Sequence, residues 1–414
     1  MKCRGFRFFC ILFYVIPFMI LTCQPEKTQE EQMSVSERQR RSLRPEAVQY
    51  LFKAQQVFQQ GAYQWALALT DSVERYNPVL TDLHFLRGRI YTALNFMENA
   101  IDSYQKVVDI DSTYTGAWYN LGNIYFRQGK TKQAIKMYHR EQSVTPASRN
   151  LLQLGRAYNS LGVTDSAKMA YEQAIAMDDS NASAYMWLGQ LYEDQGELEK
   201  ALQYSRKGLA LHPNRLSYQF IVASQLVQAN RPEEAVPYLT SVAENQPWNY
   251  GAHYNLGMAY ARIGKEEQAK IYLDQADSLQ KVSSEIQELE IRSDREPENF
   301  QIWLDLAQKL EDSGRLEEAL QAYHNAEFLQ PGNLPLQNNI AILITAMGDT
   351  SRAIARYKAI IRRNPNIPDV WFNLGVVYAN IGSTAQAKQA WEKTLELNPD
   401  HQIAQNYLSR LNSQ

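Results

Sequence analysis

From residue 47 onward, apolar residues recur with the three-to-four-residue period of helices and not with the two-residue period of strands. In the segment from Trp371 to Pro399, apolar residues three or four positions apart lie on both sides of Gly382. They are Trp371, Leu374 and Tyr378 before it, and Ala387 and Trp391 after it. Residues three and four apart share one face of an α-helix, so the segment predicts an amphipathic helix on each side of the glycine. Gly382 tolerates the left-handed conformation that ends a helix. Pro399 stops the second helix because it has no N–H to donate. A helix–turn–helix unit is therefore predicted.

The same unit recurs along nearly the whole sequence after residue 46. Units start at 47, 81, 115, 148, 182, 216, 250, 300, 334 and 368. One position of each first helix is never larger than alanine: Ala54, Gly88, Gly122, Gly155, Gly189, Ala223, Gly257, Ala307, Ala341 and Gly375. The matching position of each second helix is always alanine: Ala66, Ala100, Ala134, Ala167, Ala201, Ala235, Ala269, Ala319, Ala353 and Ala387. The turn holds glycine or asparagine: Gly61, Asn95, Gly129, Gly162, Gly196, Asn230, Gly264, Gly314, Gly348 and Gly382. Small residues at these positions let the two helices approach closely.

These units, in register, resemble the tetratricopeptide repeat (TPR), a helix–turn–helix unit of 34 residues. The resemblance implies an all-α solenoid, a right-handed superhelix of about ten repeats in which each unit buries its apolar stripe against its neighbours. The sequence offers no run of alternating strand residues, in agreement with an all-α fold.

The spacing breaks once, because the eighth unit starts at 300 and the seventh at 250. Apolar residues continue the helical period into the extra stretch: Leu279, Val282, Ile286 and Leu289. We therefore expect the second helix of unit 7 to extend to about Leu289, with Arg292 to Asn299 closing it. The predicted organisation is repeats 1–7 at 47–283, a helical extension and linker at 284–299, repeats 8–10 at 300–401 and a capping helix at 402–414. The capping stripe is expected to comprise Ile403, Tyr407, Leu408 and Leu411.

Residues 1–22 have the layout of a secretory signal, in which basic residues precede an apolar run from Phe8 to Leu21. Fourteen residues are too few to cross a bilayer, which takes about 20. The run ends at Thr22 and Cys23, which resembles the lipobox of bacterial lipoproteins. That resemblance implies lipidation of Cys23 and an outer-membrane lipoprotein facing the periplasm. Ordinary cleavage, giving a secreted or soluble periplasmic protein, is the alternative. Residues 24–46 contain no aromatic residue and predict a flexible tether.

Composition and motifs give no sign of an active site. The net charge is −3, which does not indicate nucleic-acid binding, and no cysteine follows Cys23. The sequence around Gly129 resembles the end of a phosphate loop, but Ile124 stands where that loop needs a glycine. The histidines are scattered without the i, i+4 spacing of a metal helix, and no serine lies in a G-x-S-x-G motif. We expect no enzyme, no cofactor, no metal and no small-molecule substrate.

The concave face, lined by first helices, remains as the candidate site, because families of this kind bind extended peptides there. An asparagine ladder would contact a peptide backbone through Asn120, Asn255, Asn339 and Asn373. A basic patch on units 2 to 4 would take an acidic segment or the C-terminus of a partner through Arg89, Arg127, Arg149 and Arg156, with Asn123 and Asn159 between them. Aromatic residues such as Tyr254 and Phe372 are either anchors for a partner or packing between neighbouring first helices. The acid pairs at 193–194 and 311–312 are expected to be solvated charges.

The sequence thus predicts a membrane-tethered scaffold or adaptor of the bacterial cell envelope that binds protein partners or peptide segments. A scaffold subunit of a polysaccharide export or protein secretion system is an alternative. The regulatory arm of an enzyme is a further alternative, which the missing catalytic motifs disfavour. The resemblance to the repeat family carries this functional prediction, since a fold alone does not fix function.

Overall fold

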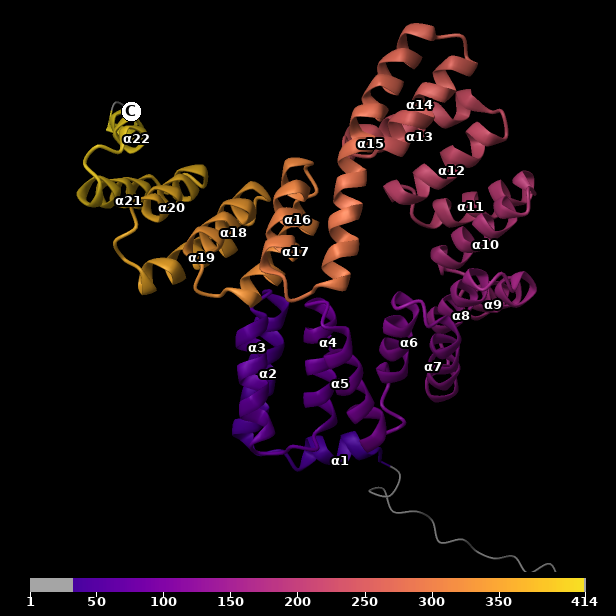
Figure 1. Cartoon of the computed structure of the whole chain (residues 1–414), viewed down its shortest axis with the longest axis horizontal. Coiled ribbons are helices and arrows are strands. Elements are labelled where there is room, and N and C mark those ends of the chain that lie inside the picture. The colour runs from indigo at the N-terminus through magenta and orange to yellow at the C-terminus, as the bar shows by residue number, and fades with distance from the viewer. Residues whose placement is uncertain (1–32, 413–414) are drawn as a thin grey trace, which may run out of the picture.

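The computed structural model describes residues 33–412, and within them it contains 22 helices and no strand (Figure 1). The predictions for the signal segment and Cys23 lie outside the described residues. The helices are α1 (Val35–Arg41), α2 (Pro45–Gln59), α3 (Tyr63–Glu74), α4 (Thr81–Ala93), α5 (Met97–Ile110), α6 (Ala117–Arg127), α7 (Thr131–Val144), α8 (Ser148–Ser160), α9 (Thr164–Met177), α10 (Ala182–Asp194), α11 (Leu198–Leu211), α12 (Leu216–Gln228), α13 (Pro232–Asn245), α14 (Tyr250–Arg262), α15 (Glu266–Arg295), α16 (Phe300–Asp312), α17 (Leu316–Leu329), α18 (Leu334–Ala346), α19 (Thr350–Arg363), α20 (Pro368–Asn380), α21 (Thr384–Leu397) and α22 (Gln402–Asn412).

From α2 to α21 the helices form consecutive hairpins, each an even-numbered helix followed by an odd-numbered one. Every predicted turn residue has a positive φ, from 56° at Asn230 to 84° at Gly314, which is the left-handed conformation that ends a first helix. Every predicted alanine of the second helices is buried, with an exposed fraction of 0–4%. The predicted all-α solenoid is therefore confirmed.

The small residue of the first helix is required where an aromatic ring lies flat against it. A Cβ atom at Gly122 would be 2.5 Å from the ring of Tyr138, and one at Gly155 would be 2.4 Å from the ring of Tyr171. Both tyrosines are buried. Glycine therefore lets the two helices of these units pack closely around the tyrosine ring.

The predicted flexible tether is wrong for its C-terminal half, because residues 35–41 form the helix α1 and α2 begins at Pro45. Ser34 caps α1 in a reciprocal capping box with Glu37. The backbone N–H of Ser36 donates to Asp111 at 3.0 Å, and Arg40 forms an ion pair with Asp82 at 2.6 Å. The absence of aromatic residues misled the prediction, since α1 is held by polar contacts to later helices rather than by its own apolar core.

The long helix α15 continues to Arg295, six residues past the end expected from the apolar period. Its second half belongs to the core of the C-terminal units: Ile286 is 2% exposed, and Val282 and Leu289 pack against the same cluster. The first half of the segment expected to close the helix, residues 292–295, is therefore itself helical. In Figure 1, α15 joins the part of the protein from α2 to α14 to the part from α16 to α22.

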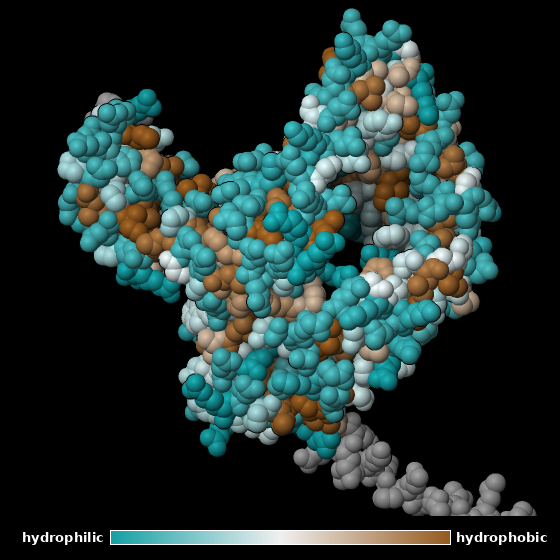
Figure 2. All heavy atoms as spheres, viewed as in Figure 1, coloured by the Kyte–Doolittle hydropathy of each residue, from teal (hydrophilic) through white to brown (hydrophobic). Residues whose placement is uncertain are grey.

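The superhelix returns on itself, which the sequence did not predict. We define the closing contact as the interface between two sets of elements. One set comprises α3 and the α2–α3 and α4–α5 turns, and the other comprises the end of α15, α17 and α19 (Figure 1). The Tyr63 hydroxyl donates to Gln321 at 3.0 Å, and the rings of Phe96 and Phe328 are 5.5 Å apart. Asn95 donates to Asp294 at 2.8 Å. Figure 2 shows an opening at the centre of the molecule, between α15 and the arc from α6 to α12.

The last helix, α22, covers unit 10 with a stripe that differs from the predicted one. Ala404 is fully buried at its centre, and Leu408 is half-buried, whereas Ile403 is 55% exposed. Tyr407 is partly exposed, but its ring lies 5.1 Å from that of Trp391. Along residues 33–412, none of the helices is both long and apolar enough to span a bilayer.

Candidate functional site

The predicted groove residues all lie on first helices, but they do not form one continuous surface. They are distributed over α4, α6, α8, α14, α18 and α20. Some of their side chains lie together and remain open to a partner, whereas others are occupied by neighbouring helices or by the closing contact.

Three successive first helices, α6, α8 and α10, bring arginine and aromatic side chains together. The Arg149 guanidinium lies 5.3 Å from the ring centre of Tyr119. The Arg156 guanidinium lies 5.7 Å from Phe126 and 4.8 Å from Trp187. We call these five residues the arginine–aromatic surface. Cation–π contact holds each guanidinium face. One N–H of Arg156 donates to Gln153 at 2.9 Å, and the other edge N–H groups of the two arginines remain able to donate.

The other two arginines of the predicted patch have different surroundings. Arg127 donates to Asn95 at 2.8 Å and lies 3.5 Å from the Asp294 carboxylate, so it belongs to the closing contact and not to an open groove. Arg89 lies 4.9 Å from the ring centre of Phe58, on the preceding first helix. Arg127 thus differs from the other three arginines in having a carboxylate beside it, and a single four-arginine patch stays a prediction.

Three of the six predicted asparagines hold neighbouring helices together. Asn255 donates to Ser224 at 3.0 Å, and Asn373 donates to Asn338 at 3.2 Å, in both cases across successive first helices. A second group of contacts stays within one hairpin: Asn120 donates to the Gly116 carbonyl, and Asn123 accepts from the Tyr138 hydroxyl. Each of these hydrogen bonds engages one group of the asparagine and leaves its other amide group for a guest.

The remaining asparagines are more open. Asn339 lines a cleft of about 440 Å³ together with Glu311 and Asp312, and Asn159 is half-buried on α8. Glu311 is not free, because it accepts a 2.7 Å hydrogen bond from the Tyr323 hydroxyl. Burial and this carboxylate both raise the pKa of Tyr323. The acid pairs expected to be solvated charges thus include one carboxylate that stabilises a hairpin.

The two predicted aromatic anchors differ in exposure. Tyr254 on α14 is 49% exposed. Phe372 is covered by the C-terminal helix region, since its ring is 4.9 Å from that of His401 and 5.7 Å from that of Tyr407. Only Tyr254 is therefore available to a partner in the manner predicted.

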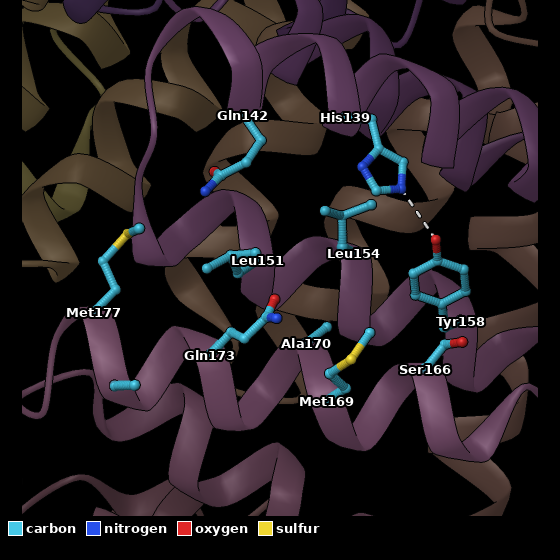
Figure 3. Close-up of a pocket in the computed structure, with 11 residues that line it drawn as sticks. His139, Gln142, Leu151, Leu154, Tyr158, Ser166, Met169, Ala170, Gln173 and Met177 are labelled. Carbon is cyan, nitrogen blue, oxygen red and sulfur yellow. Dashed lines mark hydrogen bonds between the residues drawn. The ribbon is translucent and has the colours of Figure 1, made fainter.

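A separate apolar pocket of about 610 Å³ lies between α7, α8 and α9, and no predicted site residue lines it (Figure 3). Leu151 and Leu154 form its floor, and Met169 and Met177 reach its mouth with exposed fractions of 55% and 48%. Two titratable side chains line the pocket, His139 and Tyr158, and they are hydrogen-bonded to each other at 3.0 Å. Its lining offers packing to a partner but no charged group.

The closing contact contains a buried polar network around His324, which is 4% exposed. Its Nε2 is 3.1 Å from Arg352, and its Nδ1 is 3.6 Å from the Glu327 carboxylate. Burial lowers the pKa of His324, with Glu327 opposing the effect only in part. Burial also disfavours the Glu327 carboxylate, but the His324 ring and the Arg356 guanidinium more than offset it and lower the pKa of Glu327 to about 2.

The lowered pKa of His324 predicts a loss of stability in mild acid. Below its ordinary value of 6.5 the unfolded protein binds a proton that the folded protein excludes. The free energy of unfolding should therefore fall by up to about 1.4 kcal/mol per pH unit as the pH drops below 6.5. Urea denaturation of the wild type and of His324→Gln between pH 7.5 and 5.5 measures this contribution, and the variant should show the flatter profile. Parallel profiles for the two proteins would contradict it.

One residue of the sequence, at the position after the turn of unit 2, indicates the closing contact. The residue after the turn is charged in many units, as in Lys130, Glu197 and Arg231. In unit 2 it is Phe96, which packs on Phe328. The apolar Val163 at this position of unit 4 is exposed, so the signal in unit 2 is the large aromatic ring and not apolar character alone. Trp187 carried no such signal, because first helices are rich in aromatic residues throughout.

Comparison with known proteins agrees with the repeats. The family described as Cilia and flagella-associated protein 70 C-terminal domain matches residues 52–293, more than half of the chain. Human Protein O-mannosyl-transferase TMTC3 is 27% identical over 174 residues, which are 42% of this chain and 19% of that protein. Tetratricopeptide repeat protein 1 of Schizosaccharomyces pombe is 25% identical over 379 residues, which are 84% of this chain and 35% of that protein. The chain thus spans only a minor part of the length of these relatives.

Among solved structures, the crystal structure of PilW, described as a widely conserved type IV pilus biogenesis factor, aligns with a TM-score of 0.46 and 15% identity. The alignment covers 51% of this chain and 98% of that one. Such values are too low to carry a functional conclusion. The family described as tetratricopeptide repeat matches residues 368–401. The chain is therefore a tetratricopeptide repeat protein, and over residues 52–293 it belongs to the family described as the C-terminal domain of cilia and flagella-associated protein 70.

Proposed function

We propose that this protein is a scaffold that binds extended, acidic segments of other proteins through the arginine–aromatic surface, without catalysing a reaction. The observation that carries the proposal is the placement of Arg149 and Arg156 over aromatic rings on neighbouring first helices. A guanidinium held over a ring loses less conformational entropy on binding than a free one. Its edge binds a carboxylate through two parallel hydrogen bonds, so acidic side chains or a C-terminal carboxylate fit it best.

Reversal of charge on this surface tests the proposal. Each hydrogen bond to a charged group contributes roughly 1.5–3 kcal/mol, so the double variant Arg149→Glu, Arg156→Glu should bind an acidic partner at least about tenfold more weakly. Affinity capture from an envelope extract, followed by titration of the captured partner, measures the effect. The double variant Lys132→Glu, Lys136→Glu, on the exposed face of α7, changes the charge equally and should bind as the wild type does. Equal capture by all three proteins would exclude this surface.

We further propose that a lipid on Cys23 tethers the scaffold to the bacterial outer membrane on its periplasmic side. The support is the position of Cys23 at the end of the apolar run. Because α1 begins at Val35 and contacts Asp111, the tether would be the segment between Cys23 and that helix. Growth with a labelled fatty acid should label the protein, and Cys23→Ala should abolish the label and release the protein from the membrane fraction. An unlabelled wild type would refute the lipid anchor.

A further inference from the structure

A second cavity lies in the closing contact, where it is shared by two ends of the superhelix. Its volume is about 630 Å³, and it lies between α3 of unit 1 and the helices α17, α18 and α19 of units 8 and 9. Much of its wall is apolar: Trp65, Ala68, Phe328, Pro331, Ala359 and Ile360. Trp65 is 49% exposed at this site, so a large apolar group of a ligand has an aromatic surface against which to pack.

Positive charge prevails around this cavity. Three arginines and one carboxylate line it: Arg356, Arg362, Arg363 and Glu327. Glu327 is neutralised by its ion pair with Arg356. Arg362 and Arg363 are exposed at the end of α19, and among residues 33–412 neither has a carboxylate within 4.0 Å. Lys53 adds a further charge, because its ammonium lies 4.9 Å from the Trp65 ring centre. The excess charge therefore favours an anionic ligand.

Buried polar atoms at the cavity have unused hydrogen-bonding capacity. His324 lines the wall with an exposed fraction of 4%, and its Nδ1 faces the Glu327 carboxylate at 3.6 Å, beyond hydrogen-bonding distance. Nε of Arg356 has no hydrogen-bond partner among the described residues. Buried polar groups are rarely left unpaired, so these atoms point to a group that completes the site.

We propose that this cavity binds an acidic peptide segment of a partner protein that also carries a large apolar residue. The apolar residue packs on Trp65 and Phe328, while flanking carboxylates contact Arg362 and Arg363. Because α3 forms one wall and α17 to α19 form the other, the segment binds only when the superhelix is closed. Binding therefore stabilises the closing contact. This site is distinct from the arginine–aromatic surface and does not depend on it.

A fluorescein-labelled hexapeptide of alternating glutamate and phenylalanine is the probe, with fluorescence anisotropy as the measurement. Loss of two arginine–carboxylate contacts predicts that Arg362→Glu, Arg363→Glu weakens binding at least about tenfold. Trp65→Ala should also weaken binding. The control Lys132→Glu, Lys136→Glu should bind as the wild type does. The peptide should raise the Tm of the wild type and not that of the arginine variant.

Three outcomes would overturn the proposal. The first is unchanged peptide binding by Arg362→Glu, Arg363→Glu. The second is equal binding of a hexapeptide of alternating lysine and phenylalanine, because the site would then not select charge. The third is peptide binding that Arg149→Glu, Arg156→Glu abolishes and Arg362→Glu, Arg363→Glu retains. The peptide would then occupy the arginine–aromatic surface and not the cavity.

Discussion

Replacement of Gly155 by valine is expected to lower the free energy of unfolding by roughly 3 kcal/mol, the upper end for an overpacked core. A Cβ atom at this position would lie 2.4 Å from Cε1 and 2.5 Å from Cδ1 of Tyr171. The Tyr171 ring is fully buried, so it has no open space into which to turn. The two helices of unit 4 would have to separate, and the interfaces with units 3 and 5 would be lost with them.

Valine is chosen rather than alanine because units 8 and 9 accommodate alanine beside a tyrosine, in the pairs Ala307–Tyr323 and Ala341–Tyr357. The matched control is Gly332→Val, in the loop before α18. No atom lies within 4 Å of a Cβ placed there, and the backbone φ is not positive. Urea denaturation should show a large drop in midpoint for Gly155→Val and little change for Gly332→Val. Equal midpoints would show that the close helix contact is not what stabilises the unit.

Replacement of Gly61 by asparagine is expected to open the closing contact while the helices stay intact. Asparagine tolerates the left-handed turn, as Asn95 and Asn230 show with φ values of 64° and 56°. At Gly61, however, a Cβ atom would lie 2.5 Å from Nε2 of the buried His324. Overpacking of this kind costs about 1–3 kcal/mol. Each side-chain hydrogen bond across the closing contact contributes about 0.5–1.5 kcal/mol, so the clash offsets two or three of them and should raise the population of the open superhelix.

Small-angle scattering and circular dichroism together measure this effect. The radius of gyration of Gly61→Asn should increase, and its helical signal should match that of the wild type. The control is Gly162→Asn, at the same turn position with φ +71° and no atom within 4 Å of the added Cβ. An unchanged radius of gyration for Gly61→Asn, or an equal increase for Gly162→Asn, would show that the turn of unit 1 does not hold the superhelix closed.

The hairpins could be predicted from the sequence because their determinants are local. A left-handed turn needs glycine or asparagine within a few residues of the apolar stripe, and the turn at Gly382 meets that requirement in the structure. The alanine of each second helix, such as Ala167, is buried by its own hairpin partner. Neither feature depends on how distant units are arranged.

The closing contact depends on the rotation accumulated from α4 to α15, which no short pattern encodes. Arg127 illustrates the consequence. Its position on a first helix predicted a groove residue, but the returning end of α15 places Asp294 beside it. Phe372 is likewise contacted by a later element, because Tyr407 of α22 packs on its ring. The arginine–aromatic surface was predicted in part, since Arg149 and Arg156 were found and Trp187 was missed.

The central claim is that the superhelix closes, so that unit 1 meets units 8 and 9. A protein beginning at Gln24 has no cysteine, which permits nitroxide labels at Gln55→Cys and Ala355→Cys, two exposed positions on α2 and α19. Pulsed electron–electron double resonance then measures the distance between the labels. We predict one narrow distance distribution for the otherwise unaltered protein, and a longer, broader one when Gly61→Asn is added. A broad distribution that Gly61→Asn leaves unchanged would contradict the closed superhelix.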